Sequence, residues 1–385
     1  MKIYFIFILV KLTVLLSSSE NDDKFINDSI KQAKEYMRII FNKTISPEKY
    51  NNSIEEPKIS VVIPSYKSKK YIEYCVRSIQ FQTFKSIEVI IIDDNSPDSS
   101  LESITKLIEH DKRIKLFINE QNKGIFSSRI HGLNKTSGKF VLELDQDDLL
   151  LNKNILQIAY ENALKLDLDI VEFRTFSGDY EKFDPLLGGI QNETGKIIYQ
   201  PELSHFMLNK NGVIQLNDVW IWGKLFKREL VKKTIEKLKE KNFINLRING
   251  NDDRAFMFPL FKQAKSFMRI RDFGHFFYER SNSVSHSLMK TDYQKGLALD
   301  YNFNYFYILY ILSENSFEDK AYFEYEFSRF SQFGLRQVLP FTVPKAVNLI
   351  KMMMDNEYIS MKFKVNCVRR FMKIRWIYEA LPGYF

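Results

Sequence analysis

A short acidic segment, Asp145-Gln146-Asp147-Asp148, places three carboxylates within four residues. Carboxylates this close repel one another unless a cation or another positive group lies between them. At the end of a strand, the Asp-x-Asp pattern places two carboxylates on one side, and hard divalent ions prefer such oxygen ligands. The segment therefore predicts a site for a hard divalent ion that keeps exchangeable positions. The alternative is that these residues only form turns and helix caps.

Two further loops carry turn-forming or acidic groups directly after apolar runs. Pro64-Ser65-Tyr66 follows residues 59–63, and Asp93-Asp94-Asn95-Ser96 follows residues 87–92. In parallel α/β sheets, ligands bind beyond the carboxyl ends of the strands, where such loops leave the sheet. We therefore expect these two loops and the acidic segment to meet at one edge of a sheet. Helix capping is the alternative for the Asp-Asp pair.

The stretch between about residues 58 and 150 has the pattern of an α/β protein. Short apolar runs that fit buried parallel strands occur at residues 59–63, 88–92, 114–118 and 140–144. Helical spacing between these runs predicts helices at residues 69–82, 101–110 and 124–133. Four strands that alternate with three helices predict a mainly parallel central sheet flanked by helices.

The overall composition excludes several classes of protein. Hydrophobic residues make up 45% of the chain and charged residues 27%, which excludes a disordered protein. The two cysteines, Cys75 and Cys367, exclude a disulfide framework and a cysteine-rich zinc site. A net charge of +8 suits anionic partners such as nucleotide diphosphates. Because the basic residues are dispersed and the best motif is acidic, we do not expect nucleic-acid binding.

The N-terminal residues have the features of a targeting segment. Met1-Lys2 precedes an apolar run at residues 3–16 and three serines at residues 17–19. The run is shorter than the about 20 residues that span a bilayer, so residues 1–19 predict a cleavable signal peptide. A signal anchor and a buried helix are the alternatives. Five glycosylation sequons add mild support. The predicted location is the secretory pathway (ER or Golgi lumen) or the exterior, with or without a membrane anchor.

The loops, taken with their strands, resemble the family 2 glycosyltransferases of GT-A fold. The resemblance runs in order through residues 60–66, 78–84, 88–96, 122–124 and 138–148. It implies a GT-A-like fold with a helical C-terminal region. It also implies transfer of a sugar from a nucleotide-diphosphate sugar to an acceptor hydroxyl, in glycan biosynthesis.

The resemblance assigns roles to individual residues of the three loops. In proteins of this family, the loop of Pro64 and Tyr66 cradles the nucleobase, and Tyr66 stacks on it. Asp94 holds the base or the ribose. Asp145 approaches the ribose or the metal, and Asp147 coordinates Mn²⁺ or Mg²⁺.

Two positions outside these loops also fit the family pattern. Arg129 lies where many relatives have a basic residue, so it either contacts the diphosphate or is a solvated helix position. Asp252-Asp253 resembles an acidic pair that opens a helix, in which inverting relatives use the second acid, here Asp253, as general base. Asp252 is the alternative base, and helix capping is the alternative role for both. We expect Asp253 to face the acidic segment across a cleft that admits donor sugar and acceptor.

A general base is also required on chemical grounds. A sugar hydroxyl is a poor nucleophile, and a carboxylate that accepts its proton accelerates attack by ~10²–10⁴-fold. The expected enzyme is therefore a metal-dependent, inverting, hexosyltransferase-like glycosyltransferase. A retaining enzyme would not need Asp253 in this role.

The resemblance and the composition divide the chain into five segments. Residues 1–19 are the targeting segment, and residues 20–57 form a polar stem or N-terminal helix. Residues 58–165 form the nucleotide-sugar-binding half, residues 166–288 the acceptor-side half, and residues 289–385 a helical region. We expect two short strands within residues 266–280, and a glycine-bearing loop at residues 186–190.

Residues 361–376 form a basic segment with helical spacing of apolar residues. The predicted apolar face consists of Met361, Val365, Val368, Met372 and Trp376. Such a helix either docks on the catalytic domain or lies on a membrane surface. The expected partners are the sugar donor, a glycan, lipid or protein acceptor, and, in the second case, a membrane.

Two other functions are compatible with parts of this pattern. A catalytically inactive GT-A-like module would bind nucleotide or protein without turnover, although the retained acidic motifs argue against it. A nucleotidyltransferase would need a glycine-rich loop after the first strand, and residues 64–68 contain no glycine.

Overall fold

The structure is a computed structural model. It describes residues 20–50, 55–179, 186–187, 194–200, 203, 220–248, 250–279, 291–313, 317–331 and 342–371. The predicted targeting segment, residues 1–19, lies outside these ranges. Within them, no helix combines the length and the hydropathy of a membrane-spanning segment.

The first half of the sheet contains the four predicted strands. They are β1 (Ile59–Ser65), β2 (Ile87–Asp93), β3 (Ile114–Ile118) and β4 (Phe140–Glu143). β1 pairs in parallel with β2 and β4, and β2 pairs in parallel with β3. Every residue of β1 and β2 is buried, which explains why their apolar runs do not alternate with polar residues. The predicted parallel arrangement is confirmed for this half.

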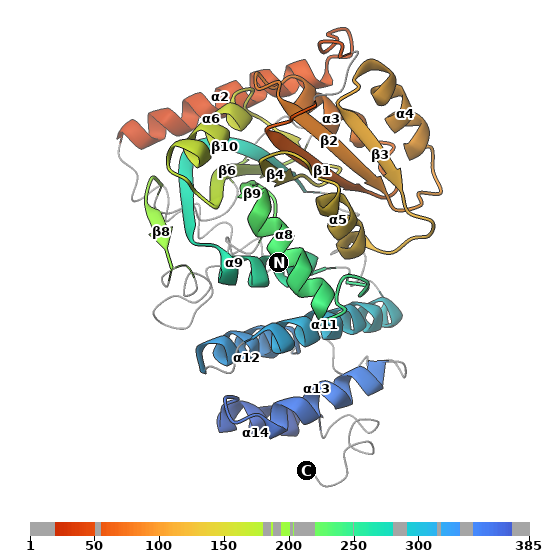
Figure 1. The fold of residues 1–385 in the computed structure, drawn as a ribbon, viewed down its shortest axis with the longest axis vertical. Coiled ribbons are helices and arrows are strands. Elements are labelled where there is room, and N and C mark those ends of the chain that lie inside the picture. The colour runs from red at the N-terminus through yellow and green to blue at the C-terminus, as the bar shows by residue number, and fades with distance from the viewer. Residues whose placement is uncertain are drawn as a thin grey trace.

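The predicted helices connect these strands. They are α3 (Ile72–Gln80), α4 (Ser100–His110) and α5 (Ile125–Asn134). Cys75 of α3 packs in one core with Val61, whereas Ile130 of α5 packs in another core with Val62. Because successive strand residues point to opposite faces, α3 and α5 cover opposite faces of the sheet (Figure 1). α5 begins after Gly124, whose φ of 87° lies in the left-handed region that favours glycine.

The second half of the sheet mixes strand directions. It adds β5 (Leu149–Leu150) and, after helix α6 (Ile155–Lys165), the strands β6 (Ile170–Gly178), β9 (Lys224–Lys227) and β10 (Ser266–Tyr278). The strand order is β3-β2-β1-β4-β9-β6-β10-β5. β9 is antiparallel to both of its neighbours, and β6 is parallel to β10. Two short strands, β7 (Leu186–Leu187) and β8 (Ile197–Tyr199), pair with β6 and β10.

Two local predictions for this half are wrong. Residues 266–280 were expected to hold two strands, but β10 is one long strand with irregular pairing near Phe273. The loop expected at residues 186–190 contains the short strand β7, and residues 188–190 lie outside the described ranges.

The N-terminal helix α2 (Glu20–Phe41) packs on the catalytic domain. Its buried residues Met37 and Ile40 lie in a core with Phe276 of β10. Arg77 of α3 donates hydrogen bonds to four carbonyl oxygens at the end of α2 and just beyond it, those of Ile39, Ile40, Asn42 and Ile45. Because the last carbonyls of a helix have no partner within the helix, Arg77 stabilises this end. The segment is thus a packed helix and not a detached stem.

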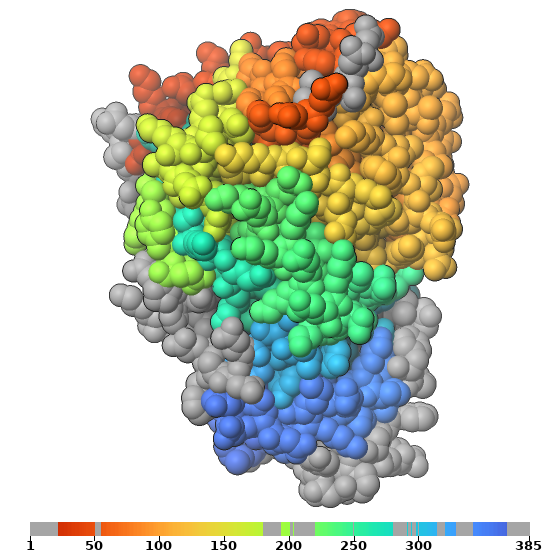
Figure 2. Space-filling model, in the orientation of Figure 1, coloured from red at the N-terminus to blue at the C-terminus, as the bar shows by residue number. Residues whose placement is uncertain are grey.

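The remaining helices follow β9 along the chain. They are α8 (Arg228–Glu240), α9 (Asp252–Gln263), α11 (Asp292–Leu312), α12 (Phe317–Ser331), α13 (Val343–Asp355) and α14 (Met361–Phe371). Helices α11 to α14 form successive layers at the end of the molecule opposite α2 (Figures 1 and 2). Arg254 of α9 forms a buried ion pair of 2.6 Å with Glu326 of α12. The ring of Phe258 stacks on Tyr322 at 5.4 Å.

Helix α14 docks on the rest of the protein, but through a different face from the predicted one. Phe363 and Cys367 are buried, and the ring of Phe363 lies 5.8 Å from that of Phe327. Met361 is 72% exposed and Val365 is 41% exposed. The two residues of each pair are four positions apart in the sequence. Apolar spacing alone therefore did not distinguish the buried face from the exposed one. Residues 372–376 lie outside the described ranges.

Candidate active site

The three predicted loops leave the sheet at one edge. β1 pairs in parallel with β2 from Ile59 to Ser65, and with β4 from Ile59 to Val62. The carboxyl ends of these strands therefore lie together, and the loops contact one another. The N–H of Asp94 donates to the carbonyl oxygen of Ser65 at 2.8 Å. The N–H of Lys67 donates to Oγ of Ser96 at 3.0 Å. The predicted meeting of the loops is confirmed.

The carboxylates of Asp93 and Asp94 stabilise these loops directly. Asp93 accepts hydrogen bonds from the N–H and the hydroxyl of Ser96, at 2.9 and 2.6 Å. Asp94 is buried and accepts three hydrogen bonds of 2.8 Å, from Nδ2 of Asn119 and from the N–H groups of Lys123 and Gly124. Asp94 thus holds the turn before α5, whereas no side chain caps α4 or α5. Its contact with a base or ribose stays a prediction.

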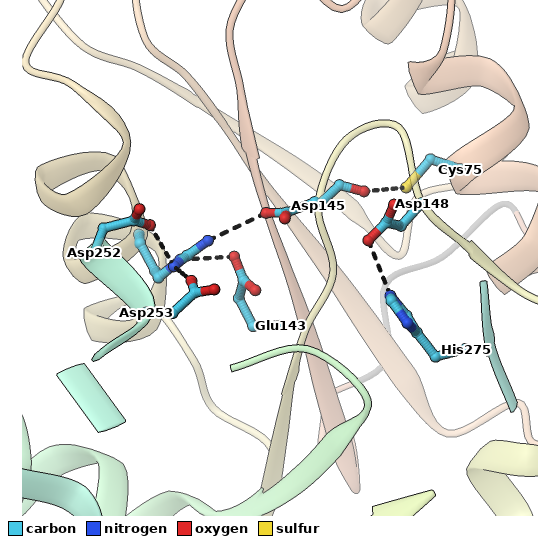
Figure 3. Close-up of polar contacts among 8 residues, drawn as sticks. Cys75, Glu143, Asp145, Asp148, Asp252, Asp253 and His275 are labelled. Carbon is cyan, nitrogen blue, oxygen red and sulfur yellow. Dashed lines mark hydrogen bonds and ion pairs between the residues drawn. The ribbon is translucent and has the colours of Figure 1, made fainter. Parts of the chain in front are cut away.

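Arg129 lies at the centre of an acidic cluster. Its guanidinium is buried and donates to Glu143 at 2.9 Å, to Asp145 at 3.1 Å and to Asp252 at 2.6 Å. The same Nη1 atom also donates to Asp253. Figure 3 shows these four carboxylates pointing toward one another from β4, from the acidic segment and from α9. The predicted alternative of a solvated helix position is therefore wrong.

Burial determines the protonation of this cluster. Desolvation raises the pKa of Asp145 to about 6 and that of Asp252 to about 7, although the charge of Arg129 opposes both shifts. Desolvation also raises the pKa of Glu143 well above its usual value. The neighbouring carboxylates raise all three further.

The acidic pair of α9 differs from the prediction in two respects. A cleft was expected between Asp253 and the acidic segment, but both Asp253 and Asp145 contact the guanidinium of Arg129, which lies between them. General helix geometry also predicts that adjacent residues point in different directions, yet Asp252 and Asp253 converge on one nitrogen atom. The attraction of both carboxylates to a single buried cation accounts for both differences. The side chain of Asp253 keeps 14% exposure.

The third acid of the acidic segment has a structural partner that the sequence did not reveal. Oδ2 of Asp148 lies 3.0 Å from Nε2 of His275, and Oδ1 accepts from the N–H of Tyr278 at 3.0 Å. Burial lowers the pKa of His275 to about 3, so the neutral imidazole donates to Asp148. The ring of Trp222 stacks on His275 at 4.7 Å. Asp148 therefore fixes the acidic segment to β10 (Figure 3).

Comparison with known proteins agrees with the fold and the loops. Residues 60–235 match the family model for glycosyl transferase family 2. Glycosyltransferase GlyG of Streptococcus pneumoniae is 29% identical over 245 residues, which are 63% of this chain and 76% of that protein. The GalNAc(5)-diNAcBac-PP-undecaprenol beta-1,3-glucosyltransferase of Campylobacter jejuni is 41% identical over 97 residues, which are 25% of this chain and 31% of that protein.

A solved structure supports the fold independently. Residues 1–349 of TarS from S. aureus, in complex with UDP-GlcNAc, superimpose with a TM-score of 0.55 at 17% sequence identity. The superposition covers 80% of this chain and 82% of that chain. The likeness shows the GT-A architecture of a mixed sheet flanked by helices.

The relatives also correct the predicted location. They are bacterial proteins, and bacteria have no ER or Golgi lumen, so the prediction of that secretory route is wrong. The fold, the order of the loops and the relatives lead to one conclusion: this chain is a glycosyltransferase with a GT-A fold, and its residues 60–235 match glycosyl transferase family 2.

Proposed function

We propose that this enzyme transfers a sugar from a nucleotide-diphosphate sugar to an acceptor hydroxyl by a metal-dependent, inverting reaction. The observation that carries this proposal is the convergence of Asp145 and the pair Asp252-Asp253 on Arg129. This cluster links two parts of the site. One is the set of loops that is expected to bind the donor, and the other is the helix that is expected to activate the acceptor. A nucleotide-binding module without activity would have no use for this second acidic group.

The donor would bind at the three loops. The ring of Tyr66 is 38% exposed, next to Pro64, and can stack on a nucleobase. Asp94 and Asp145 are the proposed contacts of the base and the ribose, and Arg129 is the proposed contact of the diphosphate. The complex of TarS with UDP-GlcNAc favours a uridine nucleotide as the first donor to test.

The acidic segment fits a divalent ion that the donor itself completes. Within the described ranges, no group of three or more His, Cys, Asp or Glu side chains could hold a metal ion alone. Ions such as Mg²⁺ are commonly held by one or two carboxylates together with substrate phosphates. Asp147 and Asp145 supply such oxygen ligands for Mn²⁺ or Mg²⁺. When bound, the ion would neutralise the charge that develops on the departing nucleotide diphosphate.

Asp253 is the proposed general base. It opens α9, and its partly exposed carboxylate can accept the proton of an acceptor hydroxyl that attacks the anomeric carbon. The C–O bond to the acceptor forms as the bond to the diphosphate breaks. Inversion at an α-linked donor gives a β-linked product, and the Campylobacter relative is named a beta-1,3-glucosyltransferase.

The acceptor class is proposed only broadly, as a glycan, a lipid or a protein. The exposed side chains of Met361 and Val365 lie next to the exposed Lys362 on α14. Apolar and basic side chains together suit peripheral contact with an anionic membrane surface. Such contact would favour a lipid-linked acceptor.

A panel of nucleotide sugars, incubated with and without Mn²⁺, tests the proposal. We expect metal-dependent hydrolysis of at least one donor, and β-linked product by NMR once an acceptor is supplied. Absence of turnover with every donor would favour the inactive module. An α-linked product from an α-linked donor would show retention and remove the proposed role of Asp253.

A further inference from the structure

The middle residue of the acidic segment makes a reciprocal contact with the nucleobase loop. Oε1 of Gln146 accepts a hydrogen bond from the N–H of Tyr66 at 2.7 Å. Nε2 of Gln146 donates to the carbonyl oxygen of Tyr66 at 3.0 Å. The side-chain amide thus pairs with a peptide group as a neighbouring strand would. The two residues are 80 positions apart in the sequence, so the contact links two separate loops.

The backbone of Tyr66 is held from a second direction as well. The next residue, Lys67, has a φ of 54°, an uncommon conformation for a residue with a side chain. Its N–H donates to Oγ of Ser96, which in turn donates to Asp93. Gln146 on one side and Ser96 on the other therefore fix where the ring of Tyr66 lies. The ring itself stays partly exposed for a ligand.

A primary amide suits this contact chemically. Only the side chains of Gln and Asn carry an amide, whose N–H donor and C=O acceptor lie side by side like those of a peptide group, and Asn is shorter by one methylene. A divalent ion bound by Asp145 and Asp147 would not require any particular residue between them. The identity of residue 146 is therefore better explained by its contact with Tyr66 than by the ion.

We propose that Gln146 is a positioning residue that couples the divalent-ion site to nucleobase recognition. The inference rests on the proposed function, in which Tyr66 stacks on the base and Asp145 and Asp147 hold the ion. When the flanking aspartates are fixed by the ion, Gln146 holds the Tyr66 backbone in the position that stacks on the base. Because binding equilibria are reciprocal, a bound base must then also favour the ion.

Uridine separates this coupling from direct contact between ion and phosphate. It has a base and a ribose but no phosphate, so it cannot bridge to the ion as UDP does. We would measure uridine affinity by saturation-transfer NMR with and without Mg²⁺, for the wild-type protein and for Gln146→Met. Met matches the length of Gln but provides neither hydrogen bond of the pair. Wild-type affinity should rise about fivefold or more with Mg²⁺, within the usual range of coupling. In Gln146→Met, uridine affinity should not respond to Mg²⁺.

Two other variants complete the design. Gln157→Met is the matched control, since Gln157 lies on α6 and its side-chain amide donates to Glu161 of the same helix. The uridine affinity of Gln157→Met should respond to Mg²⁺ as that of the wild type does. Gln146→Glu keeps the acceptor but not the donor, and should lose most of the coupling. Gln146→Glu also replaces Gln146→Met in the test if Gln146→Met does not show the native thermal unfolding transition.

The outcomes separate this inference from the proposed function. If the wild type fails to bind UDP in the presence of Mg²⁺, the proposed donor is wrong, and the inference falls with it. If UDP binds but Mg²⁺ leaves uridine affinity unchanged, the inference alone is wrong. The same holds if both Gln146 variants retain the wild-type coupling.

Discussion

Arg129 on α5 donates a hydrogen bond of 2.6 Å to Asp252 at the start of α9, although the two residues are 123 positions apart. The same guanidinium contacts Glu143 and Asp145 on the donor side. One buried cation thus fixes the distance between the two acidic groups of the site.

Replacing Arg129 should therefore destabilise the fold. Arg129→Met removes the cation that four buried or partly buried carboxylates share, and loss of one partner of a buried pair costs about 3–5 kcal/mol. Urea unfolding would measure this. Arg271→Met is the matched control, because Arg271 is 45% exposed and pairs with Asp22. A surface pair contributes about 1 kcal/mol or less. Equal losses for the two variants would contradict the central role of Arg129.

Asp147→Asn should keep the fold but lose turnover that depends on a divalent ion. The substitution preserves the size of the side chain and removes the charge that the ion requires. Activity would be titrated with Mn²⁺, and circular dichroism would confirm the fold. Asp167→Asn makes the same change at an exposed residue paired with Lys227, and should leave activity unchanged. Wild-type activity and Mn²⁺ dependence in Asp147→Asn would rule out this ligand.

Asp253→Asn should reduce transfer by ~10²-fold or more, because it removes the proton acceptor. Nucleotide affinity should barely change, since the donor loops are untouched. Asp252→Asn should have the smaller effect, since the proposed base would remain in place. If Asp252→Asn is instead the severe variant, the position of the family motif on this sequence is off by one. If neither variant affects transfer, the pair has only a structural role.

The sequence identified the three loops and their strands because each carries a local signal. Apolar runs gave β1 to β4, and turn residues marked the loops at their ends. The partners of Arg129 could not be predicted in this way. Glu143 lies within an apolar strand, where a single acid has no distinctive pattern. Asp252 reaches Arg129 only through tertiary packing, which spacing along the chain does not encode.

The error at β10 has a comparable origin. Residues 271–274, Arg-Asp-Phe-Gly, look like a turn, but the chain continues in an extended form. A Cβ atom at Gly274 would lie 2.1 Å from Cγ1 of Ile155 on α6. The glycine is therefore needed for close packing of a helix against the strand, and not for a change of direction.

As the pH is lowered, activity should be lost at a higher pH than it would be if the carboxyl groups of the site had their usual pKa values. The pKa values of Asp145, about 6, and Asp252, about 7, are raised, so both become protonated as the pH falls through this range. Protonated Asp145 cannot hold the ion, so kcat/KM at low Mn²⁺ should decline between pH 7 and pH 6. Higher Mn²⁺ should move the decline to lower pH, because ion and proton compete. A decline only near pH 4, the usual carboxyl range, would contradict the burial of these groups.

The buried pair of Arg254 and Glu326 has a consequence for how the molecule unfolds. Arg254 follows the proposed base directly on α9, and its partner Glu326 lies on α12. If α12 separated, a charged guanidinium would lose its partner and the ring of Phe258 would lose Tyr322. Local opening is costly where it breaks such contacts. The helical layers and the catalytic sheet should therefore melt as a single cooperative unit, and a fragment ending before α11 would not fold by itself.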